Sequence, residues 1–272
     1  MSALAKRRLG RTGLVVAGLG LGAMDTPHSP EAVETVTAAL DLGIGFIDTA
    51  REYEGSEHLL GRVIRERGNR DFHVASKTFS HTSSGAQWDV DRSLRVLGLE
   101  QISLYQLHDV STPAAWERVM APDGALAGLQ AARYRRLIGH IGLSCHDLEI
   151  AALAITSGEF ATIMLEYSAF FPASAPLLGL AAAHDVGVIA MRPLGGSGRA
   201  SVIRGMAADG SAGPLTPANL LRYVLSNPAV SVAIPGARYP SRIAENVATA
   251  STATPMTVDE QRILEEAAAR LY

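Results

Sequence analysis

Three short apolar segments in the first half of the chain each end in an ionisable residue of a different type. These residues are Asp48, Lys77 and His108, and Tyr53 lies five residues beyond Asp48. In a parallel barrel such apolar segments are buried strands, and the residues at their carboxyl ends face one shared mouth. The four side chains are therefore expected to meet in one pocket, an arrangement suited to proton transfer.

The four residue types match a reaction that delivers a hydride from a nicotinamide to a carbonyl carbon. The carbonyl oxygen gains negative charge and needs a proton donor within hydrogen-bonding reach, a role that suits Tyr53. A phenol with its usual pKa of about 10 is a poor donor near neutrality, and the Lys77 ammonium would lower that pKa. Asp48 would keep the lysine charged and in position, while His108 would bind and orient the carbonyl oxygen.

Taken one at a time, these residues have ordinary structural explanations. An aspartate at a strand end often caps a loop, a lysine usually lies on the surface, and a tyrosine usually packs. Their occurrence at the ends of consecutive predicted strands favours a catalytic group. An alternative is a barrel aldolase or isomerase in which Lys77 forms a Schiff base with substrate, but that reaction leaves Tyr53 unexplained.

The elements that must position these side chains alternate between strand and helix along the chain. Strands are expected at residues 14–20, 45–48, 72–77, 102–108, 138–144, 161–165, 188–191 and 230–234. Helices are expected at residues 30–42, 56–67, 86–97, 125–136, 147–157, 175–184, 217–226 and 258–269. Repeated β/α units without a break in composition predict a closed (β/α)8 barrel that forms one domain over residues 1–272.

Three local features complete the predicted fold. Leu9–Val15, with a turn at its centre, is expected to form a short β-hairpin that caps the bottom of the barrel. Ser29 is expected to be the N-cap of the helix that starts at Pro30. The glycine-rich run at residues 195–198 is expected to be a loop at the active face.

Composition and charge limit the classes of partner. A formal net charge of −3 gives no electrostatic basis for binding nucleic acid or an anionic membrane. Cys145 is the single cysteine, so an intramolecular disulfide is impossible. The amino terminus has no signal-peptide pattern, and no stretch reaches the ~20 uninterrupted apolar residues of a membrane span. A cytoplasmic protein that acts on a small molecule is expected, and the sequence leaves its oligomeric state open.

One longer motif connects the chain to a known family. The pattern Asp-Thr-Ala-x-x-Tyr-x-x-Ser-Glu-x-x-x-Gly is matched by Asp48, Thr49, Ala50, Tyr53, Ser56, Glu57 and Gly61. In this motif and over nearly its whole length the chain resembles the aldo-keto reductases. The resemblance implies a (β/α)8 barrel with Asp48, Tyr53, Lys77 and His108 as the catalytic tetrad. Glu54 departs from the pattern, since glycine usually follows the tyrosine, and this is expected to alter the local turn.

The cofactor site is predicted in the last loops of the barrel. No Gly-x-Gly-x-x-Gly motif joins a first strand to a helix, so a Rossmann domain is not expected. The run at residues 195–198 offers backbone N–H groups to a pyrophosphate. Residues 234–246 resemble the family's adenosine-phosphate segment, which implies that Arg242 binds the ribose 2′-phosphate and that Glu245 and Asn246 hold the adenine.

The same segment bears on the choice between NADPH and NADH. Gly236 stands where some members have lysine, and Arg238 would supply the missing charge, so the resemblance favours NADPH. Pro193 and Leu194 lead into the glycine-rich run. Together with Gly195, Ser197 and Gly198, they are included among the predicted cofactor-binding residues.

The nicotinamide end departs from the family pattern at several positions. Ser144 matches the serine that binds the carboxamide, but Cys145 replaces the asparagine that follows it. Met164 lies where the family often has glutamine, and Met191 takes the place of a stacking aromatic. A methionine can pack against a ring through its polarizable sulfur, so stacking is expected to persist with fewer hydrogen bonds to the amide.

These observations predict an NADPH-dependent oxidoreductase that reduces an aldehyde or ketone to the alcohol. Tyr53 would act as general acid, Lys77 and Asp48 would assist it, and His108 would orient the carbonyl. A second hypothesis keeps the fold and cofactor and makes the protein a redox-sensing or regulatory NADPH-binding protein with little turnover. Phe79 and Phe170 are the bulky residues expected nearest to the substrate.

Overall fold

Parallel strands form a nearly closed barrel at the centre of the molecule. The structure, a computed structural model, describes residues 3–68, 71–208 and 210–271. Eight barrel strands pair in the order β3 to β10, each parallel to the next. Their bounds are β3 Leu21–Gly22, β4 Phe46–Asp48, β5 His73–Thr78, β6 Ile102–Leu107, β7 Ile138–Ser144, β8 Thr162–Glu166, β9 Gly187–Met191 and β10 Val230–Ile234. Isolated parallel bridges between Leu19 and Ala233 and between Gly22 and Gly236 join the two ends of the sheet. The predicted barrel fold is therefore confirmed.

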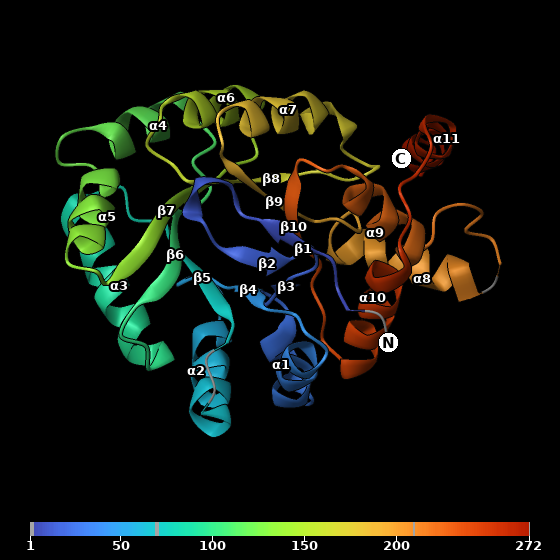
Figure 1. Ribbon diagram of the computed structural model, residues 1–272, viewed down its shortest axis with the longest axis horizontal. Coiled ribbons are helices and arrows are strands. Elements are labelled where there is room, and N and C mark those ends of the chain that lie inside the picture. Colours follow the sequence, from blue (N-terminus) through green and yellow to red (C-terminus); the bar gives the residue numbers. More distant parts are fainter. Residues whose placement is uncertain (1–2, 69–70, 209, 272) are drawn as a thin grey trace.

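A two-stranded antiparallel hairpin, β1 (Lys6–Arg8) with β2 (Val15–Ala17), precedes the barrel. Figure 1 shows it in blue, lying across the barrel. The predicted hairpin is thus present, although its strands flank the Leu9–Val15 segment instead of lying within it. The expected first barrel strand at 14–20 was wrong, since Val15–Ala17 pairs with β1 and the barrel strand β3 begins only at Leu21.

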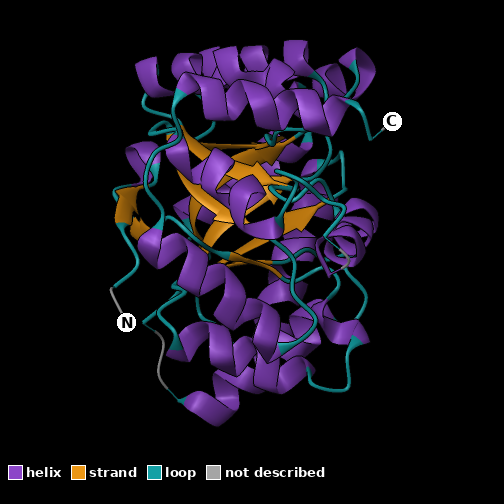
Figure 2. Ribbon diagram, turned by 90° about the vertical axis from the view of Figure 1, so that its right-hand side faces the viewer, coloured by secondary structure: helices purple, strands orange, loops and turns teal. Residues whose placement is uncertain are grey.

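Helices surround the barrel strands in Figure 1, and Figure 2 shows helices above and below the strands. Their bounds are α1 Ala32–Asp41, α2 Ser56–Arg67, α3 Ser83–Leu97, α4 Pro113–Met120, α5 Ala125–Tyr134, α6 Leu148–Thr156, α7 Ala175–Ala183, α8 Ser197–Ala208, α9 Pro217–Ser226, α10 Pro240–Thr252 and α11 Val258–Ala269. Within residues 3–68, 71–208 and 210–271, none of these helices has the length and apolarity needed to cross a bilayer.

The sequence prediction missed some helical features. Neither α4 nor α8 was expected, and the predicted loop at 195–198 extends only to Gly196 before α8 begins at Ser197. Ser29 is not the N-cap of α1, which begins at Ala32. Its hydroxyl instead accepts a hydrogen bond from the backbone N–H of Glu31 at 3.1 Å, just after a short 3-10 turn.

The strands sort their side chains between two apolar layers, because successive residues of a strand point to opposite faces. One layer fills the barrel and includes Phe46, Ala75, Leu104 and Met164. The other, larger layer packs the outer face of the barrel against the helices. Asp48 follows the interior residue Phe46 on β4, and Lys77 follows the interior residue Ala75 on β5, in each case at the next position on the same face. Ser144 pairs in register with Met164, which also faces the interior. These three side chains therefore point into the barrel at its mouth.

Candidate active site

Lys77, at the end of β5, lies at the centre of the predicted catalytic group. Its ammonium Nζ donates to Asp48 Oδ2 at 2.6 Å and to the backbone carbonyl of Thr49 at 2.8 Å. The same nitrogen lies 3.3 Å from the hydroxyl oxygen of Tyr53. The Lys77 side chain is 0% exposed and that of Asp48 is 3% exposed, so the ion pair is enclosed. The structure thus brings three of the predicted residues into direct contact.

Asp48 ends β4, which lies between β3 and β5 in the barrel. Its second oxygen, Oδ1, lies 3.4 Å from the side-chain amide nitrogen of Gln106, a buried residue of β6 that the sequence analysis did not select. Burial raises the pKa of the Asp48 carboxyl, while the charge and hydrogen bond of Lys77 act in the opposite direction. An ion pair taken out of water pays for its desolvation, so Lys77 and Asp48 each depend on the other to remain charged.

Tyr53 extends from the loop after β4, and its hydroxyl faces the lysine. Lys77 acts on the phenol as expected, because its positive charge and hydrogen bond lower the pKa. Burial of the ring acts more strongly, however, and the net pKa of Tyr53 lies above its usual value. The expected lowering of the pKa by Lys77 is therefore present, but burial outweighs it in the free protein.

His108 follows β6 directly and lies against Tyr53. The two rings meet edge to face, with centroids 5.5 Å apart and an interplanar angle of 82°. The ring of Phe79 stacks on His108 with centroids 4.1 Å apart and an angle of 16°. Phe79 is itself 44% exposed, so it contributes an accessible aromatic surface next to the histidine. Phe79, which is expected near the substrate, thus lies beside His108 of the predicted catalytic group.

Other residues of the motif that contains Asp48 and Tyr53 hold the site together. The Thr49 hydroxyl donates to Ser56 Oγ at 2.7 Å, and the Ser56 hydroxyl donates to the backbone of Ala23 at 2.9 Å. Buried Glu57 accepts from Arg51 at 2.9 Å and from the Ser76 hydroxyl at 2.7 Å. These contacts fasten the loop after β4 to helix α2 and to neighbouring strands.

The departure at Glu54 has a simple structural solution. A positive φ, which glycine adopts without strain, is needed at one residue of this turn, and it falls on Gly55, with φ of 73°. Glu54 is not among the residues of positive φ. The glycine of the turn has moved by one position, and Tyr53 still contacts Lys77.

The predicted pyrophosphate loop lies beside an acidic residue from the other end of the barrel sheet. Gly195 and Gly196 have φ of 84° and 88°, so the loop requires residues that tolerate positive φ. The hydroxyl of Ser197, which opens α8, donates to the carboxylate of Asp25, and Arg238 lies 3.8 Å from the other oxygen of that carboxylate. Asp25 thus connects two predicted cofactor segments. No sequence pattern indicated Asp25, because it lies in an irregular loop after β3.

The predicted adenosine residues lie in the first turns of α10. Arg242 is paired with Glu245 through contacts of 2.7 and 2.8 Å. Asn246 is only 4% exposed, and its side-chain amide nitrogen has no hydrogen-bond partner. A buried amide without a partner is costly, which marks this position as one that a ligand would satisfy. Gly236 is exposed in the loop before α10.

The predicted nicotinamide residues divide between the two faces of the barrel wall. Met164 and Met191 belong to the apolar layer inside the barrel, and the Ser144 hydroxyl accepts from the backbone N–H of Asp109 at 3.0 Å. Cys145, one residue further, turns outward into the layer under the helices and is 1% exposed. Burial raises the pKa of its thiol to about 12. Cys145 therefore lies away from the barrel mouth.

Two further predicted residues, Pro193 and Leu194, are buried beneath the glycine-rich loop. Leu194 packs in the layer between barrel and helices, with an exposed fraction of 4%. Phe170, the second predicted aromatic, lies against this loop, because a Cβ added to Gly195 would come within 2.7 Å of its ring. Gly195 thus permits a close approach of loop and ring that another residue would prevent.

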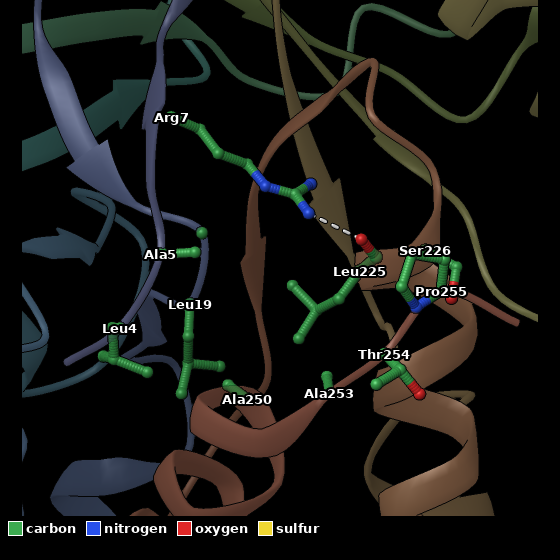
Figure 3. A pocket seen from close by; sticks show the side chains of 11 residues that line it. Leu4, Ala5, Arg7, Leu19, Leu225, Ser226, Ala250, Ala253, Thr254 and Pro255 are labelled. Carbon is green, nitrogen blue, oxygen red and sulfur yellow. Dashed lines mark hydrogen bonds between the residues drawn. The ribbon is translucent and has the colours of Figure 1, made fainter. Parts of the chain in front are cut away.

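A cavity of about 120 Å³ lies at the opposite, amino-terminal end of the strands. Figure 3 shows Arg7 of the hairpin reaching across it toward Leu225. The guanidinium donates to the backbone carbonyls of Leu225, Asn227 and Val230 at 2.5, 3.1 and 2.7 Å. Side chains at this end of a (β/α)8 barrel usually serve stability, and Arg7 fits that role because it fastens the hairpin to the end of α9.

Comparisons with known proteins agree with the fold and with the arrangement at the mouth. The chain belongs to the aldo/keto reductase family, whose model matches residues 18–212. Membership makes it an NAD(P)H-dependent oxidoreductase of the kind that reduces carbonyl groups.

Individual relatives cover most of the chain. L-galactose dehydrogenase of Arabidopsis thaliana is 26% identical over 304 residues, spanning 97% of this chain and 94% of that protein. The aldo-keto reductase yakc [NADP(+)] of Schizosaccharomyces pombe is 28% identical over 197 residues, spanning 65% of this chain and 56% of that protein. The holo form of an aldo-keto reductase from Bacillus halodurans has the same fold, with a TM-score of 0.78 at 22% identity and coverage of 97% and 96%.

Proposed function

We propose that the protein reduces an aldehyde or ketone to the alcohol with NADPH, and that residues 1–272 act as one domain. The observation that carries this proposal is the contact of one buried ammonium with both a carboxylate and a phenol. Lys77 Nζ lies 2.6 Å from Asp48 and 3.3 Å from the Tyr53 hydroxyl. A Schiff base on Lys77 is disfavoured by the same contacts, since the amine is enclosed and paired with a carboxylate.

The residues of the chain fit a nicotinamide dinucleotide along one side of the barrel mouth. Asn246, whose side-chain amide nitrogen has no hydrogen-bond partner, would bind the adenine ring, and Arg242 would bind the 2′-phosphate. The backbone of Gly195 and Gly196, with that of Ser197 and Gly198 at the start of α8, would hold the pyrophosphate. Ser144, Met164 and Met191 would receive the nicotinamide. When bound, the cofactor supplies the hydride that adds to the carbonyl carbon.

The chain's own residues supply the proton and control its path. The Tyr53 hydroxyl donates its proton to the carbonyl oxygen as that oxygen gains charge. Lys77 then stabilises the phenolate that remains, because its ammonium lies 3.3 Å from the phenol oxygen. Asp48 and the Thr49 carbonyl hold the ammonium in place. His108, packed against the tyrosine ring, orients the carbonyl oxygen by a hydrogen bond.

Binding and turnover can be tested separately. Fluorescence titrations with NADPH and NADH are expected to show tighter binding of NADPH, after which aldehydes and ketones are screened by loss of nicotinamide absorbance. Tyr53→Phe is expected to lower kcat by a factor of about 10²–10⁴, the contribution of a general acid, with little change in NADPH affinity. Tyr134→Phe, at a tyrosine that is 90% exposed, removes a hydroxyl elsewhere and serves as the control.

The outcomes separate the competing functions. Normal turnover by the Tyr53→Phe variant would contradict the assignment of the general acid. Tight NADPH binding by the wild-type protein without turnover of any carbonyl would favour the regulatory alternative. If neither NADPH nor NADH binds, the reductase proposal fails as a whole.

A further inference from the structure

Glu52, in the loop after β4, is an acidic residue at the barrel mouth to which the reaction described above gives no role. Its neighbour Arg51 turns inward to Glu57 at 2.9 Å. The Glu52 carboxylate faces the opposite way, with Oε2 lying 3.3 Å from Nδ1 of His108. Its other oxygen, Oε1, accepts a hydrogen bond from the backbone N–H of Phe79 at 3.3 Å. Two contacts from two different strand ends thus fix this carboxylate beside the imidazole.

His108 has little freedom to turn away from this carboxylate. Its side chain is only 11% exposed, one face is covered by Phe79, and Tyr53 packs against it edge to face. The charged groups that face the histidine are Glu52 by direct contact and the enclosed pair of Asp48 and Lys77 behind Tyr53. The charges of Asp48 and Lys77 compensate each other, so Glu52 is the carboxylate that contacts the imidazole directly.

The chemistry of imidazole makes this contact decisive for the proton on His108. An ionised carboxylate only accepts hydrogen bonds, so Nδ1 must carry a hydrogen to face it favourably. In the neutral ring, Nε2 is then a bare acceptor and cannot donate to a carbonyl oxygen. Only the imidazolium carries hydrogens on both nitrogens and can donate from Nε2 while Nδ1 stays bound to Glu52.

We propose that Glu52 is a positioning residue that fixes the Nδ1–H form of His108, so that the imidazolium is the form that orients the carbonyl during reduction. The inference rests on the proposed reductase function for its kinetic consequence. A hydrogen bond from a cation to the oxygen is stronger than one from a neutral ring, and it strengthens as the oxygen gains negative charge. In the reverse direction, the neutral ring accepts a hydrogen bond from the alcohol at Nε2.

The tautomer of His108 can be measured without substrate or cofactor. Protein labelled with ¹⁵N in its histidines is studied by NMR at about pH 9, where an ordinary histidine is neutral, and the His108→Asn spectrum assigns the signals. The wild-type protein is expected to show His108 mainly as the Nδ1–H tautomer, and Glu52→Gln to shift the population several-fold toward Nε2–H. Glu54→Gln, at an exposed glutamate for which the described residues offer no partner, is the matched control.

Kinetics provide the second measurement. Glu52→Gln is expected to lower kcat for carbonyl reduction by roughly 5- to 10-fold, the difference between a charge-assisted and a neutral hydrogen bond, and to leave the Kd for NADPH unchanged. Glu52→Asp, which keeps the charge, is expected to recover part of that loss. The Nε2–H tautomer in the wild-type protein, or identical histidine spectra for wild type and Glu52→Gln, would overturn the inference. Absence of turnover by the wild type would refute the proposed function instead, since the spectra decide the role of Glu52 alone.

Discussion

The enclosed ion pair between Asp48 and Lys77 can be tested through stability alone. Asp48→Asn keeps the shape of the side chain and removes its charge, leaving the 0% exposed ammonium with the Thr49 carbonyl and the Tyr53 hydroxyl as acceptors. Removing one partner of a buried pair typically costs about 3–5 kcal/mol, because the other charge stays buried without compensation. In a chain of this size such a loss corresponds to a decrease in Tm on the order of 10 °C.

A double-mutant cycle with Lys77→Met isolates the pair. Each single variant is expected to lower the free energy of unfolding in urea by about 3–5 kcal/mol, whereas the double variant is expected to lose about 2–3 kcal/mol less than the sum. The surface pair of Arg62 and Glu66 is the control, with its own contact of 2.7 Å and side chains 62% and 53% exposed. Glu66→Gln is expected to leave the free energy of unfolding nearly unchanged, because solvent screens an exposed pair.

The result that would refute this reasoning is equally specific. If Asp48→Asn costs no more than Glu66→Gln, or if the two single losses add without coupling, the ion pair does not hold the site together. The stabilised phenolate in the proposed reaction would then lack its physical basis, because Lys77 could not be counted on to remain charged beside Tyr53.

Other outcomes follow from the cofactor segment, the thiol and two half-buried imidazoles. Arg242→Ala is expected to weaken NADPH binding by about 1.5–3 kcal/mol and barely affect NADH, whereas equal losses in fluorescence titrations would show that Arg242 does not contact the 2′-phosphate. Cys145, with its pKa raised to about 12, is expected to resist iodoacetamide at pH 8 until urea unfolds the chain; rapid alkylation of the folded protein would contradict its burial. Burial lowers the pKa of His73 and His140 below the usual 6.5, so the unfolded chain takes up these protons first as the pH falls. The free energy of unfolding is therefore expected to decrease below about pH 6.5, and a His73→Gln/His140→Gln variant with an unchanged acid slope in urea melts would exclude these residues as its source.

The sequence predicted most of the barrel because most strands carry their own signal. Segments such as Val230–Ile234 are short, apolar and bounded by turn residues, and they form strands within one or two residues of the expected bounds. The prediction of the first strand failed because the pairing of this segment depends on a partner strand that has no apolar pattern of its own. Val15–Ala17 reads as a barrel strand but pairs with Lys6–Arg8, whose charged side chains carry no apolar pattern. Helix α8 was hidden for a similar reason, since its glycine- and serine-rich start is typical of a loop.

For the candidate site, spacing indicated which residues meet but not the balance of forces between them. The contact of Lys77 with Asp48 and Tyr53 could be expected from strand ends in a parallel barrel. That burial outweighs the lysine in setting the pKa of Tyr53 depends on how deeply the ring is enclosed, a quantity absent from any motif. Glu52 and Asp25 escaped selection because each lies in an irregular loop and gains its partner only through the fold.

The alternation of side chains along β7 decides which of the predicted nicotinamide residues can face the barrel mouth. Ser144 faces the barrel mouth, so the next residue, Cys145, must face the helices, where a small apolar side chain packs well. Cys145 therefore packs among apolar side chains and offers no hydrogen-bonding group to the barrel mouth. Met164 places an apolar side chain inside the barrel. Among Ser144, Cys145 and Met164, Ser144 is the polar residue that faces the mouth. The proposed cofactor would therefore be held mainly at its adenosine end, where Arg242 and the unpartnered amide of Asn246 lie.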